Sequence, residues 1–153
     1  MDFEELYQEI ILDHYRTPRN RSEDLSDTAQ NCVKHENPLC GDELLLAVDL
    51  DAAGEKIENI RFSGHGCSIS QASASMMTEA VQGLGRGEAL QMVERVREMM
   101  HGKEPDDDLG DVEALQGVSK FPVRIKCALL AWMALKDSLE NGNLKSEKSY
   151  EHN

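Results

Sequence analysis

The spacing of hydrophobic residues changes twice along the chain. It is helical over the first residues, becomes typical of strands, and is helical again after residue 67. Apolar positions recur every three or four residues over residues 2–15, which predicts an amphipathic helix. Pro18 follows, and the residue before a proline avoids helical backbone angles. The pattern over residues 43–50 and 56–63 predicts the two strands of a hairpin. We expect Cys32 to belong to a shorter strand ahead of them.

After residue 67 the spacing is that of helices. The predicted helices cover residues 68–81, 88–100 and 122–139, with a short helical turn at 112–115. Ser68 and Gln71 have the spacing of a capping box at the start of the first of these helices. Strands followed by helices predict an α+β fold, a small antiparallel three-stranded sheet with helices packed on one face. We expect one domain over residues 1–143 and a disordered tail over 144–153.

Composition narrows the classes of function. The formal net charge of −13 argues against nucleic acid and anionic membranes as partners, because the 16 Lys and Arg residues are outnumbered by 29 Asp and Glu residues and leave no excess of positive charge to bind phosphates. The acidic segment 104–111 predicts a solvated loop. The sequence has no apolar run of the roughly 18–20 residues that span a bilayer, and its first residues are acidic, unlike a signal peptide. We therefore expect a cytoplasmic protein, whose cysteines are metal ligands or reactive thiols rather than disulfides.

Three cysteines lie in contexts that suggest chemistry. Cys40 is followed by Gly41 and Asp42, Cys67 follows Gly66 at the start of a predicted helix, and Cys127 lies inside the last helix. Three thiolates and one carboxylate match the ligand count of a tetrahedral zinc site. Sulfur ligands suit zinc, copper(I) or iron–sulfur chemistry rather than magnesium or calcium.

Each of these residues also has a simpler interpretation. A single buried cysteine is usually a small hydrophobic residue, and Cys32 is interpreted in that way, as a core residue of a strand. Asp42 alone would more often cap a turn. His65 stands between two glycines, where a solvated loop histidine is favoured over a metal ligand.

The chain resembles the SufU/IscU/NifU N-terminal family of iron–sulfur cluster assembly proteins in four segments. They are residues 13–20 (DHYRTPRN), 37–42 (NPLCGD), 66–75 (GCSISQASAS) and 122–127 (PVRIKC). The resemblance implies a SufE/NifU-like α+β fold. By that likeness the metal-site residues are Cys40, Asp42, Cys67 and Cys127.

Two departures from IscU-like scaffolds point to the SufU branch. Lys126 stands where those scaffolds have a histidine, and the connection between Cys67 and Cys127 is longer. SufU-like members are zinc-dependent sulfurtransferases that accept sulfur from a SufS-type cysteine desulfurase. Residues 121–124 also differ from the Leu-Pro-Pro-Val-Lys signature that IscU-like proteins present to an Hsp70 chaperone.

The resulting hypothesis is a sulfur relay that passes sulfur to a downstream cluster-assembly scaffold. Zn²⁺ would keep the thiols deprotonated without redox chemistry of its own. Cys40 is the expected nucleophile, because a loop thiolate leaves a metal more readily than one in a helix, and Arg124 would contribute positive charge. The first alternative is an IscU-like scaffold, in which the same residues hold iron in a [2Fe–2S] cluster. The second is an interaction module with a structural zinc ion.

Overall fold

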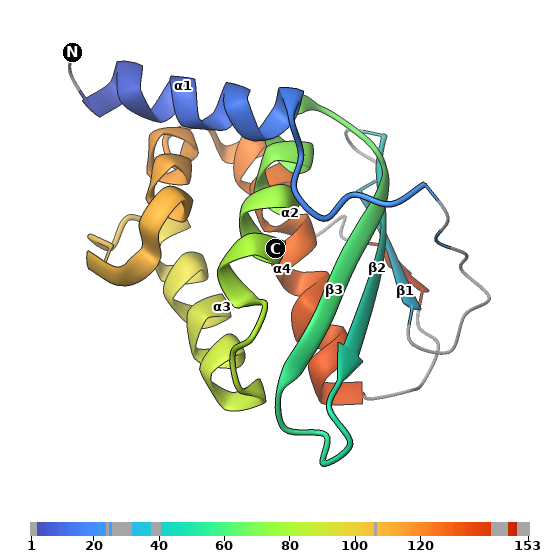
Figure 1. The fold of residues 1–153 in the computed structure, drawn as a ribbon. Coiled ribbons are helices and arrows are strands. Elements are labelled where there is room, and N and C mark those ends of the chain that lie inside the picture. The colour runs from blue at the N-terminus through green and yellow to red at the C-terminus, as the bar shows by residue number, and fades with distance from the viewer. Residues whose placement is uncertain are drawn as a thin grey trace.

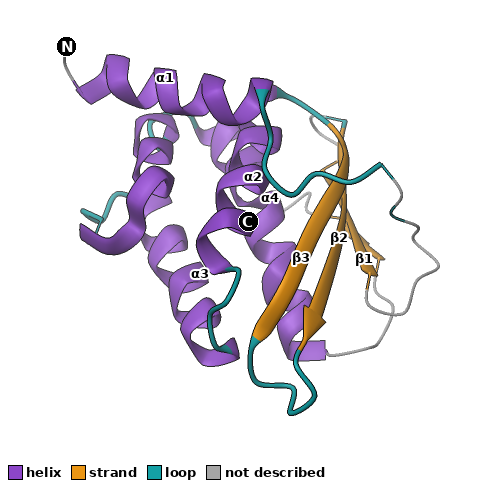
Figure 2. Cartoon of the chain, in the orientation of Figure 1, coloured by secondary structure: helices purple, strands orange, loops and turns teal. Residues whose placement is uncertain are grey.

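A computed structural model describes residues 3–23, 25, 32–37, 41–105, 107–141 and 147–149 of the chain. The described residues form two layers, with the helices lying against one face of a twisted sheet (Figure 1, Figure 2). Strands come first along the chain and most helices follow, as the hydrophobic spacing predicts. The α+β class and the helices on one face are both confirmed.

Three antiparallel strands make up most of the sheet: β1 (Cys32–Asn37), β2 (Asp42–Leu50) and β3 (Ile57–His65). β2 is central, and its pairing with β1 runs from Cys32 opposite Ala47 to Asn37 opposite Asp42. Its pairing with β3 begins at Glu43 opposite His65. The predicted three-stranded antiparallel sheet is therefore present, and this register places Asp42 and His65 at one end of it.

A short fourth strand, β4 (Glu147–Ser149), pairs in parallel with β1 and gives the strand order β3-β2-β1-β4. The sequence predicts a disordered tail over residues 144–153, so the structure differs from that prediction at three residues. The physical reason is that β1 would otherwise present unpaired backbone groups along its outer edge, which even a polar segment can pair with. Residues 144–146 and 150–153 lie outside the described residues.

Five helical elements complete the described fold. They are α1 (Phe3–Arg16), α2 (Ser68–Val81), α3 (Arg86–Met100), the 3₁₀ helix η1 (Asp107–Val118) and α4 (Pro122–Asn141). The four α-helices agree with the predicted ranges within a few residues. η1 is longer than the predicted turn at 112–115 and takes up most of the segment expected to be an acidic loop. It forms because Leu109, Val112 and Leu115 recur every third residue and are all buried.

The core lies between the sheet and helices α2 and α4. Leu44 and Leu46 of β2 and Phe62 of β3 are fully or almost fully buried, as is Trp132 of α4. The small side chains of α2 are buried as well, so this helix lies close to its neighbours. Close packing of α2 matters for function, because the helix begins directly after Cys67. Among the described residues, no helix has the length and apolar character needed to cross a membrane.

Candidate metal centre

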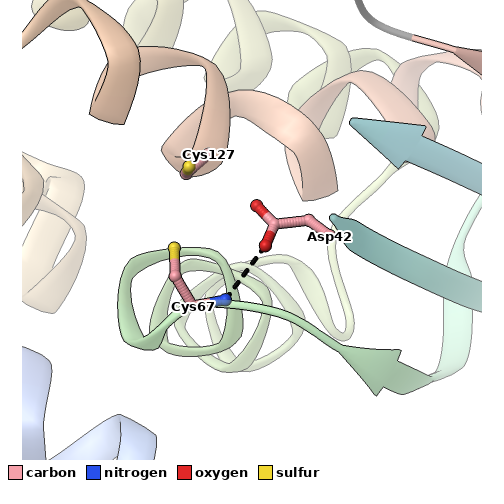
Figure 3. Close-up of side chains that lie close together, drawn as sticks. All are labelled: Asp42, Cys67 and Cys127. Atoms are coloured by element: carbon pink, nitrogen blue, oxygen red, sulfur yellow. Dashed lines mark hydrogen bonds between the residues drawn. The ribbon is translucent and has the colours of Figure 1, made fainter. Parts of the chain in front are cut away.

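Three of the residues singled out in the sequence meet at one end of the sheet. Asp42 is the first residue of β2, Cys67 directly precedes α2, and Cys127 lies in the second turn of α4. One carboxylate oxygen and the two sulfur atoms all lie within 4.8 Å of one another. Figure 3 shows the three side chains pointing toward a common space. We call this group the thiol site.

Asp42 supplies the observation that best tests whether a metal fits here. Its side chain is 2% exposed, and Oδ1 accepts a hydrogen bond from the Cys67 backbone N–H at 2.9 Å (Figure 3). Oδ2 is buried and has no hydrogen-bond partner among the described residues. A buried carboxylate oxygen without a partner is costly, and a cation held by Oδ2 and the two thiols would satisfy it. The donor set of two sulfurs and one oxygen fits zinc.

Cys67 occupies the N-cap position of α2, so its thiol lies beside the unpaired N–H groups of the first helical turn. A hydrogen bond with the Cys127 side chain lowers the pKa of the Cys67 thiol to about 5, and the backbone N–H groups of Ser70 and Ile69 act in the same direction. Burial and the charge of Asp42 oppose this change. The half-buried Cys67 is thus prepared to be a thiolate, the form that binds metals and attacks sulfur.

The predicted capping box is wrong. Cys67, not Ser68, is the N-cap residue, and no side chain caps the start of α2. Gln71 instead accepts a hydrogen bond from Arg21 Nη1 at 3.1 Å. The spacing of Ser68 and Gln71 was misleading because the helix begins one residue earlier than a capping box at these positions requires.

Gly64 and Gly66 allow the backbone between β3 and α2 to lie close to Asp42. A Cβ atom at Gly66 would collide with the Asp42 carboxylate and the Ser70 hydroxyl. Gly64 has a φ of +128°, and a Cβ there would collide with the Glu43 carbonyl. A larger residue at Gly64 would therefore push β3 away from the start of β2, and one at Gly66 would displace the Asp42 carboxylate from its place beside Cys67.

Cys127 is buried, and a hydrogen bond between helices holds the residue that follows it. The Ser73 hydroxyl donates to the Ala128 carbonyl at 2.6 Å, and Trp132 Nε1 donates to Ser73 Oγ at 3.1 Å. These two bonds connect α2 to α4 about one turn from Cys127. Neither of these two hydrogen bonds was predicted from the sequence.

The remaining candidates lie apart from this cluster or outside the described residues. Cys40 lies outside them, so its predicted role stays a prediction. Arg124 is exposed in the first turn of α4 and lines an open groove of about 860 Å³ between α1, η1 and the starts of α2 and α4. Cys32 is buried in β1, as predicted. The side chain of His65 is 74% exposed, in agreement with its interpretation as a solvated histidine.

Comparison with known proteins agrees with this geometry. The pattern of the NifU-like N-terminal domain family matches residues 6–138. The chain belongs to this family. A curated member, the zinc-dependent sulfurtransferase SufU of Bacillus subtilis, is 52% identical over 143 residues, which cover 90% of this chain and 94% of that protein.

Two further members broaden the comparison. The iron–sulfur cluster assembly scaffold protein IscU of Streptococcus pyogenes is 44% identical over 137 residues, covering 88% of this chain and 83% of that protein. A crystal structure described as an iron–sulfur cluster assembly scaffold protein for the SUF system of Fervidobacterium islandicum has a TM-score of 0.74 at 36% identity, covering 86% of this chain and 94% of that one. The family thus includes members named for sulfur transfer and members named for cluster assembly.

Proposed function

We propose that this protein is a zinc-dependent sulfurtransferase that accepts persulfide sulfur from a SufS-type cysteine desulfurase for iron–sulfur cluster assembly. The observation that carries the proposal is the buried Oδ2 of Asp42, which lies beside two thiols and has no hydrogen-bond partner in the described part of the chain. A 52% identical relative named as a zinc-dependent sulfurtransferase supports it. Two thiols and a carboxylate leave a fourth position for a ligand that can leave, as exchange requires.

In this proposal Asp42, Cys67 and Cys127 hold Zn²⁺ and Cys40 completes the site. The bound ion would supply positive charge that keeps the thiols deprotonated at neutral pH. Cys40 is two residues before Asp42 in the chain, which makes it the candidate for the fourth ligand. Its attachment next to Gly41, which has a φ of +72°, makes it the candidate for the ligand that moves.

Sulfur transfer then needs one exchange step. The Cys40 thiolate attacks the terminal sulfur of the desulfurase persulfide, and a new S–S bond forms to Cys40 as the old S–S bond breaks. The electron pair of the broken bond leaves with the desulfurase cysteine as a thiolate, so no external oxidant or reductant is needed. Arg124, exposed in the first turn of α4, would attract the anionic groups during this exchange.

A second function is favoured by a separate observation. The 44% identical relative is named as a cluster assembly scaffold, and thiolate ligands also hold iron–sulfur clusters. In this alternative the same residues would hold a [2Fe–2S] cluster while it is built. Under the sulfurtransferase proposal, a separate downstream scaffold in the cytoplasm would receive the sulfur from Cys40.

One experiment separates the two functions. The protein is purified without oxygen, its zinc, iron and sulfide are measured, and its ability to stimulate a cysteine desulfurase is compared with that of Cys40→Ala. The sulfurtransferase proposal expects about one zinc, no colour, and loss of stimulation in Cys40→Ala. Mass spectrometry after reaction with desulfurase and cysteine should find the added sulfur on the Cys40 peptide.

The matched control is Cys32→Ala, which changes a buried cysteine that is not part of the thiol site and should keep full stimulation. A brown protein that contains iron and sulfide would support the scaffold instead. Full stimulation by Cys40→Ala, with persulfide only on Cys67 or Cys127, would contradict the assignment of Cys40.

A further inference from the structure

A second group of metal-ligating side chains lies outside the thiol site, and none of its members was predicted from the sequence to bind a metal. His14 near the end of α1, Glu79 in α2 and Asp111 in η1 each place a ligand atom within 4.8 Å of the others. His14 Nε2 lies 2.9 Å from Asp111 Oδ2 and 3.9 Å from Glu79 Oε1. We call these three residues the His14 cluster.

The His14 ring is buried and held from its other side. Its Nδ1 lies 2.8 Å from Ser75 Oγ, which also accepts a hydrogen bond from the Arg19 backbone N–H at 2.8 Å. Ser75 Oγ can use its second lone pair to accept a hydrogen bond from Nδ1–H in the Nδ1-protonated tautomer of His14. In that tautomer Nε2 presents its lone pair to the two carboxylates, and metal-binding histidines are commonly oriented by such a bond to the second nitrogen.

The short distance between Nε2 and Asp111 then has a direct consequence. In the other tautomer Nε2–H donates to Asp111 Oδ2 at 2.9 Å, and in the tautomer described above a metal ion would take the place of that proton between the two atoms. The imidazole is fully buried, whereas the side chains of Asp111 and Glu79 are each 51% exposed. The nitrogen is therefore fixed in place, while the two carboxylates can adjust to an ion that arrives from solvent.

The charges around the cluster favour a cation. Arg19 Nη2 forms an ion pair with Asp13 Oδ2 at 2.7 Å, and Arg19 Nε lies 3.9 Å from Glu79 Oε2. The hydrogen bond to Asp13 raises the pKa of Arg19, and the charges of Asp13, Glu79 and Asp111 add to that effect. The carboxylates of Asp13, Glu79 and Asp111 thus act on the guanidinium of Arg19, which neutralises part of their charge.

We propose that the His14 cluster binds a divalent transition-metal ion through His14 Nε2 and the carboxylates of Glu79 and Asp111, independently of the thiol site. One imidazole and two carboxylates suit Zn²⁺, Fe²⁺, Mn²⁺ or Co²⁺, and the lack of sulfur disfavours copper(I). Water molecules on the exposed side would complete the coordination. Binding displaces the proton shared between Nε2 and Asp111 to solvent, and the ion then joins α1, α2 and η1.

The test uses full-length protein whose thiol site has first been filled with one equivalent of zinc. Mn²⁺ is titrated into it and free Mn²⁺ is followed by electron paramagnetic resonance. The proposal expects one bound Mn²⁺ per chain while zinc stays bound. Co²⁺ in place of Mn²⁺ should give weak visible bands without the intense sulfur-to-cobalt absorption of a thiolate site, which would identify nitrogen and oxygen ligands.

The substitutions are made at the exposed ligands Glu79 and Asp111, because replacing the buried His14 would also disturb folding. Glu79→Gln and Asp111→Asn should each weaken Mn²⁺ binding at least tenfold. Glu9→Gln, at an exposed position of α1, removes the same charge and should leave binding within about twofold. Arg19→Gln should strengthen binding, because it removes the guanidinium that competes with the metal for Glu79.

Three results would overturn the proposal. The first is zinc-filled protein that binds no Mn²⁺, in which case His14 and Asp111 share only a proton. The second is Mn²⁺ affinity that Glu79→Gln and Asp111→Asn leave unchanged. The third is Co²⁺ that binds only by releasing zinc and with sulfur-to-cobalt absorption, which would place it in the thiol site. None of these results bears on sulfur transfer, so this proposal and the proposed function fail separately.

Discussion

The thiol site and the His14 cluster both use helix α2, but they satisfy their polar atoms in different ways. Cys67 is the N-cap residue of α2, and Glu79 lies twelve residues later, about 18 Å along a helix at 1.5 Å per residue. At the thiol site, Oδ2 of Asp42 is buried without a partner among the described residues. In the His14 cluster, both imidazole nitrogens have partners and the carboxylates reach solvent.

This difference predicts different affinities. A metal at the thiol site would bind a buried oxygen that no described residue contacts by a hydrogen bond, and it would also meet two soft sulfur donors. Its binding energy therefore adds directly to the free energy of folding. A metal in the His14 cluster must displace a proton and compete with Arg19 and with water. We therefore expect zinc to be retained at the thiol site through purification and the second ion to exchange readily.

The largest expected effect comes from removing a sulfur of the thiol site. Cys67→Ala and Cys127→Ala should each lose nearly all tightly held zinc and lower the melting temperature by several degrees, because metal binding and folding are coupled. Zinc content by mass spectrometry and thermal unfolding are the measurements. Cys32→Ala, which removes the buried cysteine of β1, should keep its zinc. Normal zinc content in Cys67→Ala or Cys127→Ala would remove the contrast between the two sites.

The next largest effect is expected at Gly66, which is not itself a ligand. Gly66→Ala places a methyl group against the Asp42 carboxylate and the Ser70 hydroxyl, so the carboxylate must move away from the two thiols. Zinc affinity measured against a competing chelator should fall at least tenfold. Gly87→Ala is the matched control, because a Cβ at Gly87 meets no atom within 4 Å. Equal zinc affinity in both variants would show that the position of Asp42 is not decisive.

A third change separates the charge of Asp42 from its shape. Asp42→Asn keeps an oxygen that can accept the Cys67 N–H but removes the negative charge from Oδ2. Zinc should bind about ten- to a hundredfold more weakly, and the rise in melting temperature on adding zinc should shrink. The metal-free protein should lose little stability, since Oδ2, which the substitution replaces, has no hydrogen-bond partner among the residues that the structure describes. If zinc stabilises Asp42→Asn as much as the parent protein, Asp42 is a structural residue and not a ligand.

The parts of this picture that sequence reasoning could predict are local. The helices and the first three strands follow from spacing of 3.6 and two residues. Asp42 and Cys67 of the thiol site stand beside glycines, whereas Cys127 was chosen because it completes the ligand set of the family that the chain resembles. β4 could not be predicted, because its three polar residues depend on the open edge of β1. The cap of α2 was predicted one residue too late, because the N-cap is a cysteine, which forms no capping hydrogen bond here.

The contacts that sequence reasoning missed join residues far apart in the chain. His14 and Asp111 are 97 positions apart, and Ser73 and Trp132 are 59 apart. The position of α1 relative to η1, and of α2 relative to α4, depends on the packing of the whole core. A histidine or serine on a helix face has the same local pattern whether it meets such a partner or water, so periodicity carries no signal for these pairs.

A smaller effect is expected at Ser73, in the part of α2 that lies between the two sites. Ser73→Ala removes the acceptor of Trp132 Nε1 and the donor to the Ala128 carbonyl, both buried. Leaving buried polar groups without partners should cost about 1–3 kcal/mol in the free energy of unfolding. Zinc content should stay at one equivalent, because every proposed ligand is kept. In a double-mutant cycle with Trp132→Phe, additive losses would show that the hydroxyl and the indole do not act together.

The smallest effect is expected from the His14 cluster without metal. Asp111→Asn weakens the contact with the buried His14 that holds the end of α1 against η1. Because the Asp111 side chain is half-exposed and solvent screens its charge, metal-free protein should lose less than about 1 kcal/mol of stability. The loss should shrink further at high salt, whereas the losses at Gly66 and Ser73 arise from packing and buried hydrogen bonds and should not. Denaturant unfolding at low and high salt measures this. A loss as large as that of Ser73→Ala, unchanged by salt, would show that the His14 cluster is a buried structural contact and that the contrast with the thiol site is weaker than we infer.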